Sequence, residues 1–112
     1  MAPLILINHL LALTLEIALL IGLARVGLAL RPGWMGWVLA AILVLIAVAL
    51  WTRFAAPSSA TRLSGSALLG FKSAIFAAGA IGLAWRDGAA VGAVFAALVV
   101  LHLALATKLG IL

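Results

Sequence analysis

Four long apolar segments follow one another along the chain, and short polar stretches separate them. The segments cover about residues 4–24, 34–51, 67–85 and 89–107, and each is close to the ~20 residues that a helix needs to cross a bilayer. Continuous apolar runs such as residues 38–46 lack the alternation of barrel strands. Because a backbone in hydrocarbon must satisfy its own hydrogen bonds, we predict four membrane-spanning helices.

The stretches between the segments carry helix breakers and charges. They are the Arg-Pro-Gly of residues 31–33, the Pro- and Ser-containing residues 57–65, and the Arg-Asp-Gly of residues 86–88. We expect Trp34, Trp37 and Trp85 near one membrane interface and Trp51 near the other. Short connections make neighbouring helices antiparallel, so the prediction is an all-α integral membrane four-helix bundle, up-down-up-down, with residues 1–112 as a single transmembrane domain.

Composition supports lipid as the main solvent of this chain. Hydrophobic residues make up 69% of the sequence and charged residues 8%, which leaves too few polar groups for a hydrated surface. The net charge of +5 comes from singly spaced Lys and Arg, a pattern that suits anionic lipid headgroups and excludes a nucleic-acid partner. The absence of cysteine excludes disulfides and thiolate chemistry.

The charges leave the orientation in the membrane open. Arg25, Arg31 and Arg86 are expected on one side, and Arg53, Arg62 and Lys108 on the other, so the positive-inside count is a tie. The first segment has no preceding Lys or Arg and is too long for a signal-peptide core. We therefore expect it to be a retained span.

Small residues recur every four positions on two of the predicted helices. The third segment carries Ser66, Gly70, Ala74, Ala78 and Gly82, and the fourth carries Gly88, Gly92 and Ala96. Such ridges let helices approach closely in a membrane. We expect them to pack the third and fourth spans together, and the same faces would also suit a homo-oligomer.

Two charged residues fall inside the predicted spans. An ionised Glu16 on the lipid face would cost roughly 2.5 kcal/mol or more, so we expect it to face inward, to be paired or to be protonated. Lys72 has two interpretations that the sequence does not separate. It extends its ammonium group to the interface, or it is the partner of Glu16.

Other polar side chains fall at a similar depth in an up-down-up-down bundle. The candidate ligand- or proton-binding residues are Glu16, Lys72, His9, His102, Asn8 and Ser73. His9 and Glu16 are seven residues apart and would share one face of the first helix. The prediction is a polar pocket between the first, third and fourth helices.

Several chemistries could use such a pocket. We favour a non-enzymatic role in which the polar cluster stabilises the bundle and binds a small or lipidic ligand. A proton-coupled transporter using Glu16 is the first alternative, and an enzyme acting on a lipid or isoprenoid with Glu16 as general acid is the second. His9 and His102 could ligate haem, but nothing else marks such a site, so we expect no cofactor and no metal.

The sequence resembles the YrdB-like family of small four-span bacterial membrane proteins, whose domain has no known function. The resemblance covers nearly the whole chain. The features that carry it are Asn8 followed by Leu15-Glu16-Ile17, the stretch from Trp51 to Pro57, Arg62-Leu63, and the stretch from Phe71 to Ala77. It implies a multi-pass protein of the bacterial cytoplasmic (inner) membrane, with membrane lipids as partners.

The sequence departs from that family at two positions. Members tend to carry a basic residue near Ala12 and an acidic one near Lys72, so Glu16 and Lys72 would be the opposite charges left here. The chain is also similar to the small multidrug resistance transporters in its length, its four spans and its first-span Glu. Their tryptophan inside the third span has no counterpart, because Trp85 closes that segment.

Overall fold

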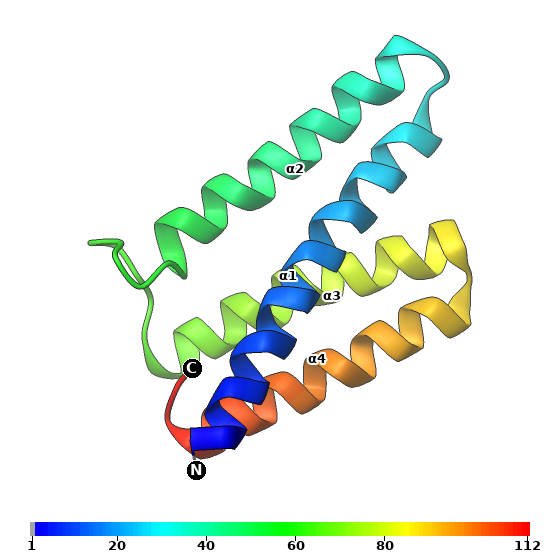
Figure 1. Ribbon diagram of the computed structural model, residues 1–112. Helices are drawn as coiled ribbons and strands as arrows, with labels where there is room; N and C mark the ends of the chain where they lie inside the picture. Colours follow the sequence, from blue (N-terminus) through cyan, green and yellow to red (C-terminus); the bar gives the residue numbers. More distant parts are fainter. Residues whose placement is uncertain (1) are drawn as a thin grey trace.

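The computed structural model describes residues 2–112, and that part of the chain consists of four helices with no strand (Figure 1). The helices are α1 (Ala2–Leu30), α2 (Trp34–Phe54), α3 (Gly65–Asp87) and α4 (Ala89–Leu109). All four are long and apolar enough to cross a membrane. The prediction of an all-α membrane four-helix bundle is confirmed.

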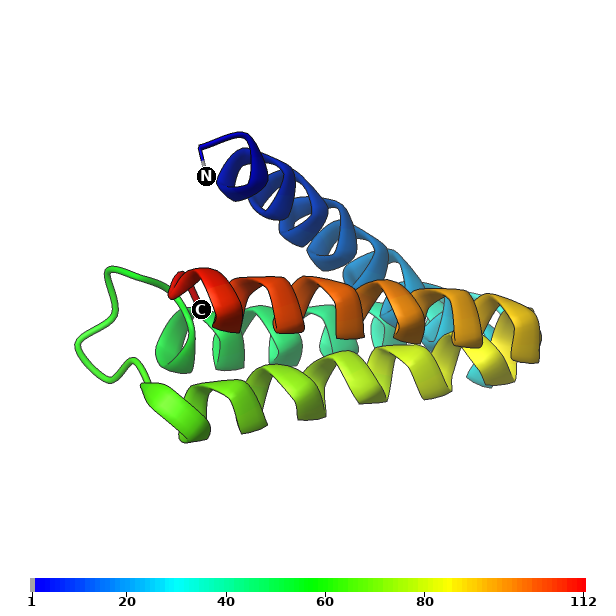
Figure 2. The ribbon, with the colours of Figure 1, turned by 90° about the horizontal axis from the view of Figure 1, so that it is seen from below.

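The bundle is built from two antiparallel hairpins, α1 with α2 and α3 with α4. Figures 1 and 2 show that the hairpins cross at an angle, with the start of α1 rising over the end of α4. As a result α1 contacts all three other helices, whereas α2 and α3 meet only near the connection between them. Away from that connection α2 and α3 diverge (Figure 1).

Helix α1 ends six residues later than the expected span, at Leu30 instead of Ala24. Nothing between these residues breaks a helix before Pro32, and Arg25 is accommodated because its guanidinium forms an ion pair with Asp87 of α3. The longer helix also places Gly27 against α2. A carbon atom added at Gly27 would overlap the backbone at Leu39 and Ala40, so α1 and α2 approach each other closely here.

The second hairpin is closed by a different glycine. A Cβ at Gly92 would lie 2.8 Å from the carbonyl oxygen of Ala80 and 3.0 Å from the Cα of Ala84, so α4 contacts α3 through Gly92. Between the two helices Gly88 adopts a φ of 106°, a conformation that residues with a Cβ rarely take, and this allows a one-residue connection. Ala96 is half-buried on the same helix.

The expected ridge on α3 faces the opposite way from the prediction. Four of its members, Ser66, Gly70, Ala74 and Ala78, are exposed, and only Gly82 is half-buried, with Val26 of α1 as its neighbour. The buried stripe of α3 instead consists of Leu68, Lys72, Phe76, Gly79 and Leu83. Large side chains such as Phe76 fill most of the space left between the crossing hairpins, and Gly79 is the one small residue of this stripe. Use of the ridge by a second copy stays a prediction.

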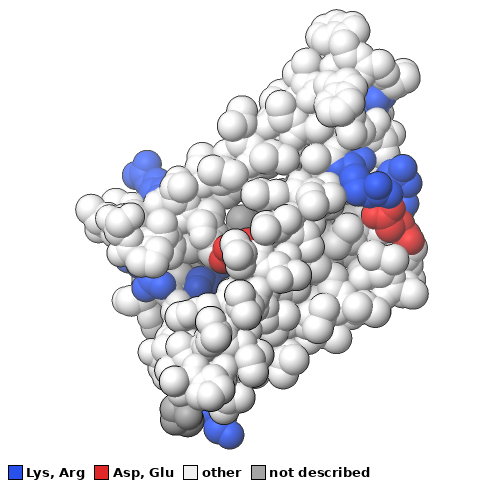
Figure 3. All heavy atoms as spheres, in the orientation of Figure 1, with Lys and Arg blue, Asp and Glu red and all other residues white. Residues whose placement is uncertain are grey.

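Charges collect at the two ends of the molecule. Figure 3 shows most of the Lys and Arg toward the ends of the molecule, with one small charged patch on the largely uncharged surface between them. Trp34, Trp37 and Trp85 are 72%, 69% and 59% exposed at the end that carries Arg25 and Arg31, as expected for residues at a membrane interface. Trp51 differs, because its ring contacts Phe71 and Phe76 inside the bundle.

The contact at Gly27 gives a test of the first hairpin. Gly27→Leu forces α1 and α2 apart, so we expect it to lower the free energy of unfolding by about 2 kcal/mol or more in detergent. Gly70→Leu is the matched control, because a side chain there meets open space and should leave stability within ~0.5 kcal/mol of wild type. Thermal unfolding followed by circular dichroism measures the stability of both variants. Equal losses of stability in Gly27→Leu and Gly70→Leu would show that α1 and α2 are not in tight contact at Gly27.

Candidate functional site

A buried polar pair joins the two ends of the sequence. Asn8 of α1 is 1% exposed and His102 of α4 is 4% exposed, and the His102 Nδ1 atom donates a hydrogen bond of 2.9 Å to the Asn8 Oδ1 atom. Because apolar surroundings offer neither group another partner, each satisfies the other. The pair therefore fixes the start of α1 on the end of α4.

Phe76 separates this pair from a second polar group. Its side chain is completely buried, and its ring packs edge-on against both His102 and Trp51, with centroid distances of 6.2 and 6.0 Å. Leu15 and Leu19 of α1 complete the same apolar core. The core thus divides the polar residues that the sequence predicts to lie in one pocket.

Lys72 lies on the other side of Phe76 and points toward the connection between α2 and α3. Its Nζ atom donates a hydrogen bond of 2.9 Å to the main-chain oxygen of Leu112 and lies 5.6 Å from the centre of the Trp51 ring. Arg62 donates to the same oxygen at 3.1 Å and to the Ala55 carbonyl at 2.9 Å. These contacts hold the 55–64 connection, the start of α3 and the segment after α4 together.

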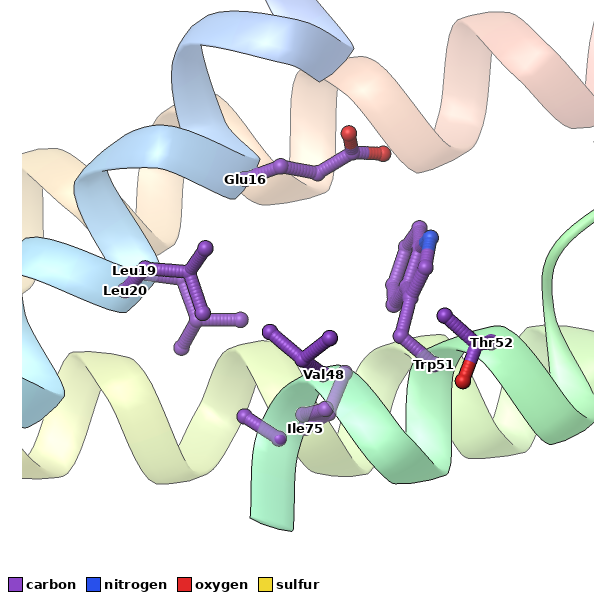
Figure 4. Close-up of a pocket in the computed structure, with 8 residues that line it drawn as sticks. Glu16, Leu19, Leu20, Val48, Trp51, Thr52 and Ile75 are labelled. Carbon is purple, nitrogen blue, oxygen red and sulfur yellow. The ribbon is translucent and has the colours of Figure 1, made fainter. Parts of the chain in front are cut away.

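Glu16 lines a cavity of about 120 Å³ between α1, α2 and α3. The residues that line it are Glu16, Leu19, Leu20, Ala47, Val48, Trp51, Thr52 and Ile75. Figure 4 shows the Glu16 side chain reaching from α1 over the cavity toward the Trp51 ring. Thr52 donates its hydroxyl hydrogen to the Ala49 carbonyl of its own helix. Glu16 is therefore the main charged group and the main hydrogen-bond acceptor among the residues that line this cavity.

The Glu16 carboxylate has no hydrogen bond or ion pair with any group in residues 2–112. The ion pairs within that range involve Asp87, with Arg25 and Arg86, at the far end of the molecule. In Figure 3 the two acidic patches are accordingly far apart, and basic atoms lie close to the central one. Glu16 and Lys72 therefore both lie near the Trp51 ring, and they do not form an ion pair.

Not all predicted site residues come together. Asn8 and His102 pair, and Glu16 and Lys72 lie near Trp51, but His9 and Ser73 are exposed on the outside of their helices. The described residues contain no group of three His, Asp or Glu side chains that could hold a metal ion.

The cavity also involves a helix outside the predicted pocket. Trp51 and Thr52 of α2 line it, whereas the predicted pocket lay between α1, α3 and α4. The signal that could have found them is the position of Trp51 one turn inside a helix end, where an indole can turn either to the interface or to the core.

An apolar groove continues from this cavity toward the other end of the molecule. It has a volume of about 460 Å³, with α1 as its floor and α2 and α3 as its walls. The residues that line it are Leu23, Val26, Leu30, Leu43, Ala78, Ile81, Gly82 and Trp85. On α1 and α3 these residues follow those of the Glu16 cavity, and on the antiparallel α2 Leu43 lies one turn before Ala47. The cavity and the groove therefore run along the same face of α1.

Four helices able to span a membrane, with polar groups gathered between them, define a small multi-pass membrane protein. The chain belongs to the family described as "protein of unknown function (DUF2568)", which matches residues 10–100. This range includes every residue that lines the Glu16 cavity. No curated protein and no solved structure matches the chain.

The Asn8–His102 pair gives a double-mutant test. Asn8→Leu or His102→Leu alone leaves the partner buried without a hydrogen bond, so each should cost about 1–3 kcal/mol of stability. The loss of stability in the double variant should be smaller than the sum of the two single losses by about 0.5–2 kcal/mol. Unfolding by dodecyl sulfate in mixed micelles measures this, with His9→Leu as the exposed control. Strict additivity would show that the two side chains do not interact.

Proposed function

We propose that this protein is a YrdB-like protein of the bacterial inner membrane that binds a small, partly apolar cation at the Glu16 cavity. The observation that carries the proposal is a membrane carboxylate that faces a cavity and has no partner within residues 2–112. An unpaired carboxylate in such surroundings is costly, and a bound cation would remove that cost. The polar residues that do have partners, Asn8 and His102, stabilise the bundle.

The rest of the cavity fits the same class of ligand. Leu19, Leu20 and Val48 offer apolar contacts, and the Trp51 ring adds a further apolar surface. Pockets for small molecules are mostly apolar with a few polar groups that fix the orientation, and here the carboxylate supplies that group. A cavity of about 120 Å³ limits the part of the ligand near Glu16 to a few heavy atoms.

Proton-coupled transport is the second candidate, because the same carboxylate could exchange a proton for the cation. The feature that favours it is the separation of α2 from α3, which leaves the two hairpins joined mainly through α1. Hairpins joined in this way could rock against each other and expose Glu16 alternately to the two sides. Uptake of the cation into vesicles that depends on a pH gradient would distinguish transport from binding alone.

Binding of a short amine tests the proposed function. Hexylamine carries a protonated amine, and hexanol has nearly the same shape without the charge. We expect hexylamine to bind the detergent-solubilised protein and hexanol to bind more weakly. Glu16→Gln should lower the affinity for hexylamine about tenfold to a hundredfold, because a hydrogen bond to a charged group contributes ~1.5–3 kcal/mol. Isothermal titration calorimetry measures the affinities.

The control for this experiment is His9→Gln, which changes an exposed polar residue on the same helix and should keep the wild-type affinity. Glu16→Asp keeps the charge on a shorter side chain and should retain part of the binding. If Glu16→Gln binds hexylamine as wild type does, or if hexanol binds equally well, the proposal is wrong.

A further inference from the structure

We propose that a phospholipid with a negatively charged headgroup binds along the groove between α3 and α4, with its phosphate at the end of the bundle that carries Arg62 and Lys108. This groove, the α3–α4 groove, shares no lining residue with the Glu16 cavity. The inference therefore goes beyond the proposed function and does not depend on it.

The α3–α4 groove has two parts that meet end to end. The first part, the head region, has a volume of about 510 Å³, and its polar lining residues are Arg62, Ser64, Ser66 and Thr107. The second part, the tail region, has a volume of about 520 Å³, and its apolar lining residues are Leu69, Val100, Leu103 and Ala104. Leu69 and Thr107 line both parts, so the two parts are continuous.

The two regions lie at the depths where a phospholipid has its headgroup and its chains. The head region lies where α3 begins and α4 ends, at the ends of two membrane-spanning helices (Figure 1). Ser73 is seven residues after Ser66, and Val100 is seven before Thr107, so the tail region reaches ~10 Å deeper at ~1.5 Å per residue. The groove thus leads from a polar end into the hydrocarbon of one leaflet.

The charges at this end of the bundle favour a negative headgroup. Arg62 and Lys72 donate hydrogen bonds to the same main-chain oxygen of Leu112, so two positive side chains share one acceptor. Lys108 lines the tail region and has no ion pair within residues 2–112. No Asp or Glu lines either region. Positive side chains at a membrane surface attract anionic lipids, and here they are in excess.

Glu16 does not reverse this balance. It lines its cavity together with Ile75, which is nine residues from Ser66. At ~100° per residue the two lie on opposite sides of α3, so the carboxylate and the α3–α4 groove belong to different faces. Even when Glu16 is counted, the positive charges of Arg62, Lys72 and Lys108 remain in excess.

Hydrogen-bond donors for a phosphate are also in place. The guanidinium of Arg62 is held by its Nε and Nη2 bonds to the carbonyl oxygens of Ala55 and Leu112, and within residues 2–112 its Nη1 atom makes no hydrogen bond. A guanidinium group fixed in this way binds a phosphate at little cost in side-chain entropy. A headgroup that also carries an amine fits less well, because that amine has no acidic side chain to pair with in the groove.

Native mass spectrometry of the full chain tests the inference, because it counts the lipids that each protein retains after release from mixed micelles. The probes are phosphatidylglycerol, whose phosphate is its one charge, and phosphatidylethanolamine, which adds an amine. We expect one phosphatidylglycerol to be retained, with an affinity about tenfold or more above that for phosphatidylethanolamine. Glycerol phosphate has the headgroup without the chains, so it should not displace the lipid at equal concentration.

Two pairs of variants locate the lipid. Lys108→Gln removes a positive charge from the groove and should lower the affinity about fivefold, whereas Arg31→Gln removes one from an exposed residue at the opposite end and should leave the affinity unchanged. Ala104→Phe fills part of the tail region and should lower the affinity about tenfold. Its control is Ala97→Phe, because Ala97 is an exposed alanine of α4 that does not line the groove.

Several results would overturn the inference. Equal losses in Lys108→Gln and Arg31→Gln would mean that the attraction depends on net charge alone. Equal retention of phosphatidylethanolamine, or full affinity in Ala104→Phe, would contradict the proposed headgroup or the proposed path of the chain. Displacement by glycerol phosphate would indicate a site for free phosphates, and a dimer without lipid would show that a second copy covers the groove. Hexylamine binding at Glu16 is measured separately, so the proposed function stands or fails on its own.

Discussion

The position of α1 between the two hairpins is the constraint on which the rest of the structure depends. In lipid, apolar side chains gain little by contacting each other, so helices associate where small residues allow close approach. On α1 these contacts are Gly27 with α2 and Gly22 with Leu83 of α3, and Asn8 adds the hydrogen bond to α4. Because one helix serves three partners, α2 and α3 are held apart, and the groove is the space that remains.

The same arrangement explains why Glu16 is available for a ligand. The stripe of α1 that enters the core contains Asn8, Leu15 and Leu19, and Glu16 lies one position around the helix from Leu15. It therefore faces the space between α2 and α3 and not the core. Lys72, which could have neutralised it, is directed instead to the Leu112 oxygen and the Trp51 ring. A groove with a charge at one end follows from these two facts.

The helices could be predicted from the sequence because each apolar run has the length of a bilayer crossing and no other backbone state is stable there. The side of each helix that contacts its neighbours could not be predicted in this way. In α3 the four-residue spacing of small residues indicated the contact surface, but the crossing angle of the hairpins left space that only side chains such as Phe76 fill.

On α1 the spacing of His9 and Glu16 indicated a shared inward face, and the structure buries Asn8 instead. The role of Trp51 was also beyond the sequence, since an indole near a helix end suits an interface as well as a core. Which neighbour each face meets depends on the crossing of the hairpins, and that is a property of the whole bundle.

Cross-linking measures the separation of α2 from α3 most directly, and the chain has no cysteine of its own to interfere. A disulfide needs Cα atoms within ~7 Å. Gly22→Cys with Leu83→Cys tests the α1–α3 contact, and Leu43→Cys with Ala78→Cys tests opposite walls of the groove. In bilayers under mild oxidation, we expect a cross-link in the first pair and none in the second. Rapid cross-linking of the second pair would show that α2 and α3 close on each other, and that the groove leading to Glu16 does not exist.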